Sequence, residues 1–186
     1  MQKVETCCKP YCTCHNLDLH GIPHLRRVAF VAGRIAGIYG EDTGAAVLAG
    51  FLHDCTRTDD GGGNRHAHDS AALAKRIVER FYPQLDSGRI CECIRHHADG
   101  LTTTDRLTGS VWDADRLELS RLRCKIMPEL LSTGIARRIA SIYGMAMKQD
   151  VIQKFPFEKK TYRRGAGSES DDGNPMGIDR LWRYSQ

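Results

Sequence analysis

"FLHDC", residues 51–55, places a histidine and an aspartate side by side at the end of an apolar run. The run, from about Thr43 to His53, is long and apolar enough to predict a buried helix. His53 and Asp54 are then either the polar end of that helix and nothing more, or two ligands that reach one metal ion from a rigid base. Other residues of the sequence distinguish between these two interpretations.

Helical periodicity continues on both sides of this stretch. Before it, residues 22–40 carry apolar residues at helical spacing between Pro23, near a helix start, and Gly40, near a helix end. After it, we expect helices over residues 66–82, 87–97 and about 110–122, and from about residue 132 onward. No run of alternating β-branched residues predicts a strand. The pattern therefore predicts an all-α fold, a compact helical bundle with about six core helices.

The composition divides the chain into three segments. Residues 1–15 are predicted to be a Cys-rich N-terminal tail, residues 16–150 the folded domain, and residues 151–186 a flexible C-terminal extension rich in Gly, Ser and charge. The cysteines of the first segment lack the paired C-x-x-C spacing of a zinc ribbon. That spacing favours an unstructured, thiol-rich tail over a metal site.

Charge and hydropathy exclude several classes of protein. The chain has 186 residues, a formal net charge of +4 and a pI near 8.6. This mild positive charge suits a small phosphorylated substrate and makes a nucleic-acid partner unlikely. No apolar run approaches the roughly 20 residues of a membrane span, and the polar N-terminus does not resemble a secretory signal. We expect a cytoplasmic protein with reduced cysteines, and the sequence leaves its oligomeric state open.

Histidine and aspartate recur at the ends of the expected helices. The candidates are His24 near the start of the first helix, His53 and Asp54 at the end of the second, His66 at the start of the third, His96 and His97 at the end of the fourth, and Asp113 and Asp115 in the fifth. In a bundle whose helices alternate in direction, most of these positions lie on one side. Imidazole and carboxylate together suit Mn, Fe, Co, Ni, Zn or Mg. The pattern therefore predicts a site for one or two divalent metal ions.

Five segments carry these residues. They are HGIPHLRRV (20–28), FLHDC (51–55), RHAHDSA (65–71), CIRHHADG (93–100) and WDADRLEL (112–119). Each motif alone is weak, but in this order they resemble the HD-domain superfamily of metal-dependent phosphohydrolases, and in particular a small stand-alone bacterial branch with HGxxHxxRV and DADRL signatures. The resemblance covers about residues 18–123. No GYP motif follows HHADG, which disfavours a cyclic-dinucleotide phosphodiesterase.

The resemblance implies a first metal site. His24, His53, Asp54 and Asp115 would bind one ion, and Asp54 would also act in catalysis by orienting the attacking water or taking its proton. Asp115 is preferred over Asp113 as a ligand because the family's ligand directly precedes the basic residue of the DADRL segment. Asp113 is then a possible accessory residue that orients a water or ligand.

The resemblance also implies a second metal site, which some members of the superfamily have. Here His66 would match the first of the two further ligand positions and His96 and His97 the second, with Asp54 bridging the two ions. His20 lies four residues before His24, where some members carry a further ligand. Pro23 between them disfavours one continuous helix, so His20 is a possible accessory residue that shapes the helix start.

Arg57 follows the His-Asp pair in a loop that contains three consecutive glycines, residues 61–63. Its guanidinium could hold a substrate phosphate through paired hydrogen bonds, or it could be a solvated loop residue. The glycines are not a nucleotide-binding loop, because no Lys and Ser or Thr follow them. They predict a turn or a mobile flap over the site.

The implied activity is that of a metal-dependent phosphohydrolase, which acts on a nucleotide or other small phosphate ester through a metal-activated water. Two alternatives stay open. One is a di-iron HD-type oxygenase, which would require dioxygen. The other is a non-catalytic module that binds a nucleotide or a partner protein and retains its metal site. The identity and number of the bound metal ions would separate these functions.

Overall fold

The computed structural model describes residues 2–146, which form α-helices and short 3-10 helices and no β-strand. The α-helices are α1 (Gln2–Cys8), α2 (Ile22–Ile38), α3 (Thr43–Leu52), α4 (Arg65–Phe81), α5 (Ser87–Arg95), α6 (Arg106–Glu118) and α7 (Gly134–Ala146). The 3-10 helices are η1 (Lys9–Tyr11), η2 (Leu119–Leu122) and η3 (Pro128–Leu130). The predicted all-α class is confirmed. The predicted extension over residues 151–186 lies outside the described residues.

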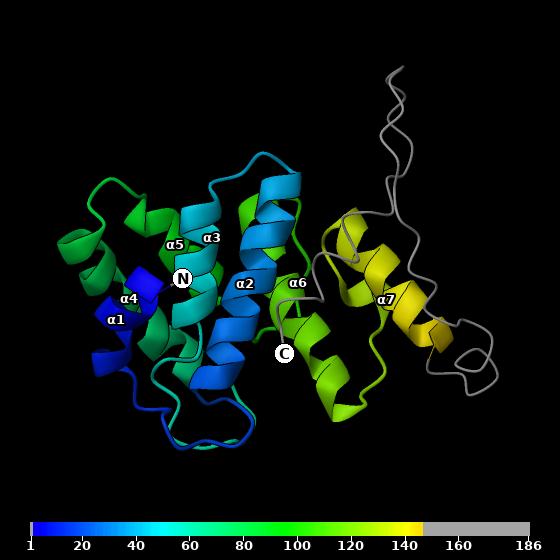
Figure 1. Cartoon of the computed structure of the whole chain (residues 1–186), viewed down its shortest axis with the longest axis horizontal. Coiled ribbons are helices and arrows are strands. Elements are labelled where there is room, and N and C mark those ends of the chain that lie inside the picture. Colours follow the sequence, from blue (N-terminus) through cyan, green and yellow to red (C-terminus); the bar gives the residue numbers. More distant parts are fainter. Residues whose placement is uncertain (1, 147–186) are drawn as a thin grey trace.

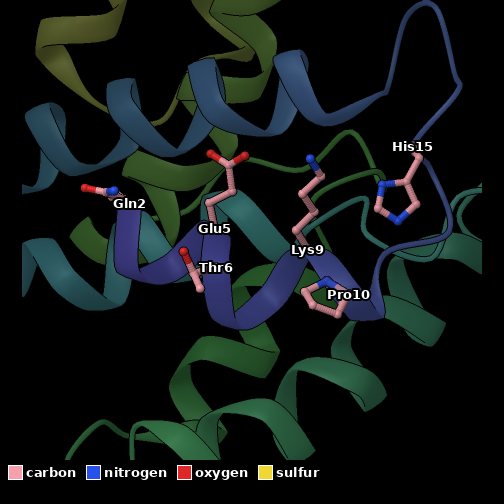
Figure 2. A pocket seen from close by; sticks show the side chains of 6 residues that line it. All are labelled: Gln2, Glu5, Thr6, Lys9, Pro10 and His15. Atoms are coloured by element: carbon pink, nitrogen blue, oxygen red, sulfur yellow. The ribbon is translucent and has the colours of Figure 1, made fainter.

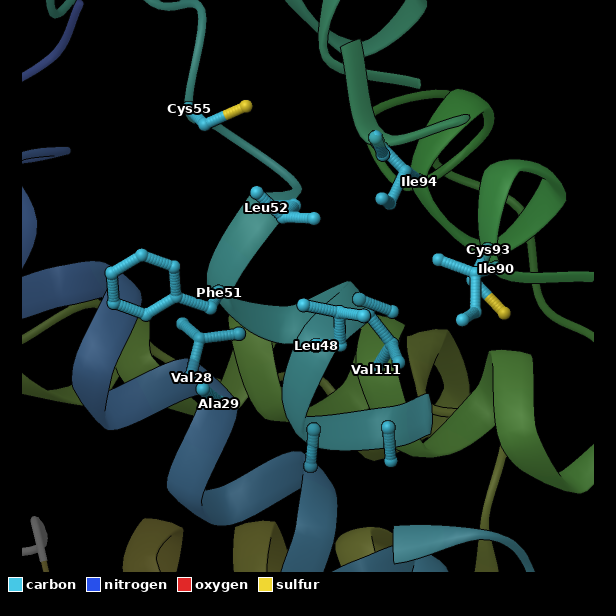
Figure 3. Packing of buried hydrophobic residues seen from close by; sticks show 14 of the residues in the cluster. Val28, Ala29, Leu48, Phe51, Leu52, Cys55, Ile90, Cys93, Ile94 and Val111 are labelled. Atoms are coloured by element: carbon cyan, nitrogen blue, oxygen red, sulfur yellow. The ribbon is translucent and has the colours of Figure 1, made fainter. Parts of the chain in front are cut away.

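α3 lies at the centre of the bundle, against α2, α5 and α6 (Figure 1). Its sequence is apolar on nearly every side, which is typical of a helix that is buried all round. Leu48 and Phe51 are fully buried, and Phe51 packs near Val28 of α2 (Figure 3). A Cβ at Gly50 would lie 2.8 Å from the Cα of Ala29, so this glycine lets the two helix backbones touch. The end of α3 is thereby held rigidly in the core.

The starts of three helices are fixed by aspartate caps. α3, α5 and α6 each follow an aspartate (Asp42, Asp86 and Asp105) whose carboxylate accepts a hydrogen bond from the backbone N–H three residues later. In α2, Pro23 occupies the first turn, where its missing N–H has no intrahelical partner to lose. These caps set which residues of each helix face the interior. None of the described helices is long and apolar enough to cross a membrane.

The first residues of the chain do not form the unstructured tail that their composition predicts. Residues 2–8 form α1, which packs against α3. Glu5, which Figure 2 shows on α1, accepts a hydrogen bond from Nε of Arg26 on α2 at 2.8 Å. The expectation of an unstructured segment is therefore wrong, because α1 contacts two core helices.

The segment that connects α1 to α2 contains buried cysteines. Cys8, Cys12 and Cys14 are at most 5% exposed and belong to the same apolar core as Cys55. The backbone N–H of Thr13 donates a hydrogen bond to the carbonyl oxygen of Cys55 at 2.8 Å. Cysteine acts here as a small apolar residue. The Cys-rich segment thus packs directly behind the end of α3.

Candidate metal centre

Six polar side chains from five helices meet at one end of the bundle. They are His24 in the first turn of α2, His53 and Asp54 directly after α3, His66 in the first turn of α4, His97 shortly after α5, and Asp115 in α6. The side chain of Asp115 is 25% exposed, whereas each of the others is 10% exposed or less. The six therefore form a buried cluster, which we call the His-Asp cluster, with its most open edge at Asp115.

One half of the His-Asp cluster contains His24, His53 and Asp115. The Nε2 atoms of His24 and His53 are 3.1 Å apart. Oδ1 of Asp115 lies 3.4 Å from the first of these nitrogens and 3.5 Å from the second. The three ligand atoms are within 4.8 Å of one another, so one cation could contact all of them.

The other half contains His66 and His97. Oδ1 of Asp54 lies 3.0 Å from Nε2 of His66 and 3.3 Å from Nε2 of His97. The second oxygen of the same carboxylate, Oδ2, lies 3.5 Å from Nε2 of His53 and 3.8 Å from Nε2 of His24. Asp54 therefore stands between two sets of imidazole nitrogens and presents one oxygen to each.

Hydrogen bonds on the outer side of the rings fix which nitrogens face inward as acceptors. Nδ1 of His53 donates to the carbonyl oxygen of Gly50 at 2.8 Å, and Nδ1 of His97 donates to that of Ile94 at 2.7 Å. A carbonyl only accepts, so in the neutral rings Nδ1 carries the hydrogen and Nε2 presents a lone pair. Such support of the outer nitrogen is typical of histidines that bind metals.

The inward-facing atoms fit a cation better than they fit each other. Oδ1 of Asp54 is buried and has no hydrogen-bond partner, although two imidazole nitrogens approach it. Lone pairs of nitrogen and oxygen that face one another in a buried space repel, and a buried carboxylate needs a compensating positive charge. A divalent metal ion that prefers nitrogen and oxygen ligands would satisfy both requirements.

Glu118 supports His24 from behind, and it is not among the site residues predicted from the sequence. Its Oε2 accepts a hydrogen bond from Nδ1 of His24 at 3.2 Å, and its carboxylate also binds Nε of Arg27 and Nε of Arg121. Glu118 lies three residues after Asp115, so both carboxylates project from one face of α6. This three-residue spacing is the sequence feature that could have identified Glu118 as a site residue. The arrangement orients the ring of His24 and strengthens its Nε2 as a ligand.

The electrostatics of the cluster favour two ionised carboxylates. Burial alone would raise the pKa of Asp54 and of Asp115, but the neighbouring histidines hold both pKa values well below the ordinary range. Burial alone would lower the pKa of His24, but hydrogen bonds to Asp115 and Glu118 raise it to about 9. Without another cation, a proton on His24 would therefore offset part of the negative charge of these two carboxylates.

Of the two adjacent histidines predicted for the second site, His97 joins the cluster and His96 does not. The side chain of His96 is 39% exposed, and its Nδ1 donates to Oδ2 of Asp99 at 2.8 Å. It follows directly on the last residue of α5 and points toward solvent. The expectation that His96 could supply a ligand finds no support in this geometry.

Asp113 is likewise not placed for an accessory role. Its carboxylate is fully buried and accepts hydrogen bonds at 2.7 Å from the backbone N–H groups of Ser132 and Thr133 and from the Thr133 hydroxyl. Residues two positions apart on a helix face different directions, so Asp113 points away from the side of Asp115. Asp113 holds the segment before α7, and burial raises its pKa.

His20 and Arg57 lie at the edge of the cluster. Nδ1 of His20 donates to Oδ1 of Asp60 at 2.8 Å, and the His20 ring is edge-on to His24 with 5.4 Å between ring centres. Nε of Arg57 lies 2.9 Å from Oδ2 of Asp54. His20 thus borders His24 without joining either ligand group, and Arg57 touches the bridging carboxylate directly.

Comparisons with known proteins agree with this architecture. A family model described as HD domain matches residues 21–126. The crystal structure of a predicted HD superfamily hydrolase from an uncultured Thermotogales bacterium is similar to this chain, with a TM-score of 0.64 and 23% sequence identity. The match covers 83% of this chain and 90% of the other, and at this identity it shows a shared fold. No match was found among curated proteins.

Proposed function

Since this chain belongs to the HD domain family, we propose that it is a metal-dependent phosphohydrolase that acts on a nucleotide or other small phosphate ester. The observation that carries this proposal is Asp54, whose two buried oxygens face two sets of imidazole nitrogens. His24, His53, Asp54 and Asp115 would hold one divalent ion. His66 and His97 would hold a second, which Asp54 would bridge.

A bound divalent ion would lower the pKa of a nearby water and offset negative charge on the phosphoryl oxygens. The chain's own residues would supply orientation. Asp54 is ionised because its pKa is low, so it can accept a hydrogen bond from the attacking water. Arg57, in contact with Asp54, would hold a phosphate oxygen through its remaining N–H donors. The water oxygen would form a new bond to phosphorus as the ester P–O bond breaks, and the proton lost by the water would protonate the leaving oxygen, so that inorganic phosphate and the alcohol are released.

The same ligand set supports a second candidate, a di-iron oxygenase. Four imidazoles on two sides of one bridging carboxylate suit a pair of iron ions as well as they suit a hydrolytic pair of metals. The two activities differ in the metal that supports turnover and in the need for dioxygen. A non-catalytic binding module would instead retain metal without turnover.

Metal reconstitution tests the proposal. Metal-free protein would be loaded in turn with Mn, Fe, Co, Ni, Zn and Mg, and p-nitrophenyl phosphate hydrolysis would be followed beside elemental analysis. We expect hydrolysis with at least one metal and its loss in His53→Ala, while the exposed His68→Ala variant keeps activity. Full activity in His53→Ala would contradict the assigned site. Oxygen uptake by an iron-loaded protein without phosphatase activity would favour the oxygenase.

A further inference from the structure

A polar cavity of about 610 Å³ lies beside the His-Asp cluster, between the end of α3 and the start of α4. Its lining includes Arg57, Asp59, Gly62, Arg65, His66 and Asp69. His66 is itself a member of the cluster, with its Nε2 3.0 Å from Oδ1 of Asp54, and Nε of Arg57 lies 2.9 Å from Oδ2 of the same carboxylate. A molecule in this cavity, which we call the loop cavity, would therefore border the metal-ligating atoms.

Another hollow in the described part of the chain lacks this connection. The one beside α1 (Figure 2) is lined by residues that include Glu5, Lys9 and His15, and none of its lining residues belongs to the cluster. The loop cavity, unlike that hollow, lies where it could hold the part of a substrate that is not transferred.

The charges that line the loop cavity are balanced. The lining includes two arginines, Arg57 and Arg65, and two aspartates, Asp59 and Asp69, and Nε of Arg65 lies 3.7 Å from Oδ2 of Asp69. Arg57 is in addition engaged by Asp54 and donates from Nη1 to the carbonyl oxygen of Gly61 at 2.7 Å. A second phosphate or another strongly charged group would meet the two carboxylates there. The occupant of the cavity itself should therefore carry no net charge.

The lining is also mainly polar. Among the described residues that form it, the only aromatic ring is the imidazole of His66, which belongs to the His-Asp cluster, and none has a large aliphatic side chain. A nucleobase is usually held by stacking or by an apolar wall; here there is no apolar wall, and the ring of His66 already faces Asp54. Carboxylates, hydroxyls, an amide and arginine N–H groups instead match the donors and acceptors of a molecule with many hydroxyl groups.

We propose that the loop cavity binds the neutral, hydroxyl-rich part of the substrate, and that the substrate is a sugar or polyol monophosphate. The phosphate would lie at the border between Arg57 and the His-Asp cluster, and the hydroxyl-bearing remainder would extend along the loop toward Asp69. This inference rests on the proposed phosphohydrolase function and narrows its substrate class.

Gly62 offers a way to reduce the cavity without disturbing the fold. A Cβ at this position would meet nothing within 4 Å, and its backbone is outside the left-handed region. Gly63, with φ +104°, would be strained by any side chain. Because Gly62 lines the cavity, Gly62→Val adds side-chain volume to the lining without a clash at Cβ. Gly134→Ala, which makes an ordinary 3.6 Å contact with Tyr39 at α7, is the matched control.

The experiment compares metal-loaded wild-type, Gly62→Val and Gly134→Ala proteins on ribose 5-phosphate, phenyl phosphate and a nucleoside 5′-monophosphate. We expect the highest kcat/KM for ribose 5-phosphate. In Gly62→Val, the ratio of kcat/KM for ribose 5-phosphate to that for phenyl phosphate should fall about tenfold. Gly134→Ala should keep the wild-type ratio. A preference for phenyl phosphate or for the nucleotide, or an unchanged ratio in Gly62→Val, would overturn the proposal.

Calorimetric titration with ribose 5-phosphate tests the loop cavity as a binding site separately from the phosphohydrolase function. Binding that Gly62→Val weakens, in a protein that hydrolyses none of the three esters, would support the loop cavity and overturn the phosphohydrolase function. Equal binding to the wild-type and Gly62→Val proteins would overturn the cavity assignment whether or not hydrolysis occurs.

Discussion

Two adjacent histidines at the end of α5 have opposite surroundings. His97 is buried with its Nδ1 bound to the carbonyl oxygen of Ile94, whereas His96 pairs with Asp99 near solvent. The sequence could not choose between them, because both follow the same helix and either could turn inward. The choice depends on how the backbone leaves the last turn, which no local pattern of residue types determines.

This contrast predicts a matched pair of variants. His97→Ala should weaken metal binding at the second site by about tenfold or more, because it removes an inward-facing nitrogen. His96→Ala should bind metal as the wild-type protein does. Titration of metal-free protein with Co or Mn, followed by calorimetry, measures both. Equal losses in the two variants would contradict the assigned ligand set.

His24 predicts a dependence of stability on pH in the metal-free protein. Its pKa is raised from the ordinary 6.5 to about 9, so the folded state binds its proton more tightly than the unfolded state does. The resulting stabilisation is fully present below pH 6.5 and should be lost as the pH rises toward 9. Urea unfolding between pH 6 and 9.5, in the presence of a chelator, measures the free energy of unfolding across this range.

The metal-loaded protein serves as the comparison for this pH series. A divalent ion would replace the proton at His24, so the decrease in stability between pH 6.5 and 9 should be smaller after loading. An equally steep decrease in both forms would argue that His24 does not bind the metal. Loading should also release protons near pH 7.5, where His24 is still protonated in the metal-free protein.

The role of Glu118 could not be predicted from its own position in the sequence, because it depends on which residues contact it. Its spacing from Asp115 placed it on the same face of α6, but a glutamate near the end of a helix is commonly a surface residue. Its role depends on His24, Arg27 and Arg121, which come from distant parts of the chain or from the following turn. The sequence supplies the candidate, and the packing of α2 against α6 supplies its partners.

At the scale of elements, the core helices follow from strong local signals. The predicted helices over 66–82 and 87–97 end within two residues of the observed α4 and α5, because Asp86, Pro83 and the apolar spacing mark their limits. α6 begins four residues earlier than predicted, at Arg106, since the cap on Asp105 was not recognised. Helix-limiting residues and apolar periodicity were therefore sufficient to predict most of the core helices.

α1 is the element that the sequence did not predict. It has seven residues, and of these only Val4 and Cys8 are buried, which is too little for a helical period to be recognised. A helix this short is marginal alone and depends on tertiary packing. The residues that pack are cysteines, and a Cys-rich segment is more readily interpreted as a metal site or a reactive tail than as part of an apolar core.

A buried thiol therefore predicts a measurable loss of stability. Cys8→Ser places a hydroxyl where no solvent reaches and should lower the free energy of unfolding by about 1–3 kcal/mol. Cys124→Ser, at an exposed thiol, should change it by less than about 0.5 kcal/mol. Urea unfolding under reducing conditions provides the comparison. No difference between the two variants would mean that the first segment contributes little to the core.

At the scale of the whole molecule, α6 connects the His-Asp cluster to the far side of the bundle. Asp115 faces the cluster, and two residues earlier Asp113 holds the segment before α7. The sequence predicted that helix ends would converge, because an up-down bundle brings them to one side. It did not predict that one helix would serve both sides, since that depends on the path of residues 119–133.

Asp113→Ala tests this division of roles. The change leaves the backbone N–H groups of Ser132 and Thr133 without their partner and should destabilise the protein by roughly 2–5 kcal/mol. Metal stoichiometry should stay at the wild-type value in the folded protein. Thermal unfolding and elemental analysis measure the two effects, with the exposed Glu129→Ala as control. A loss of metal without a loss of stability would instead assign Asp113 to the site.

The outer hydrogen bonds of His53 and His97 also have a spectroscopic consequence. Each ring holds its Nδ1 hydrogen against a carbonyl oxygen in a buried position, so these hydrogens should exchange slowly with solvent. They should then give resolved imidazole N–H signals in NMR spectra, outside the crowded amide region. Because the opposite nitrogen of each ring faces the ligand space, the chain carries two built-in reporters, one for each half of the cluster.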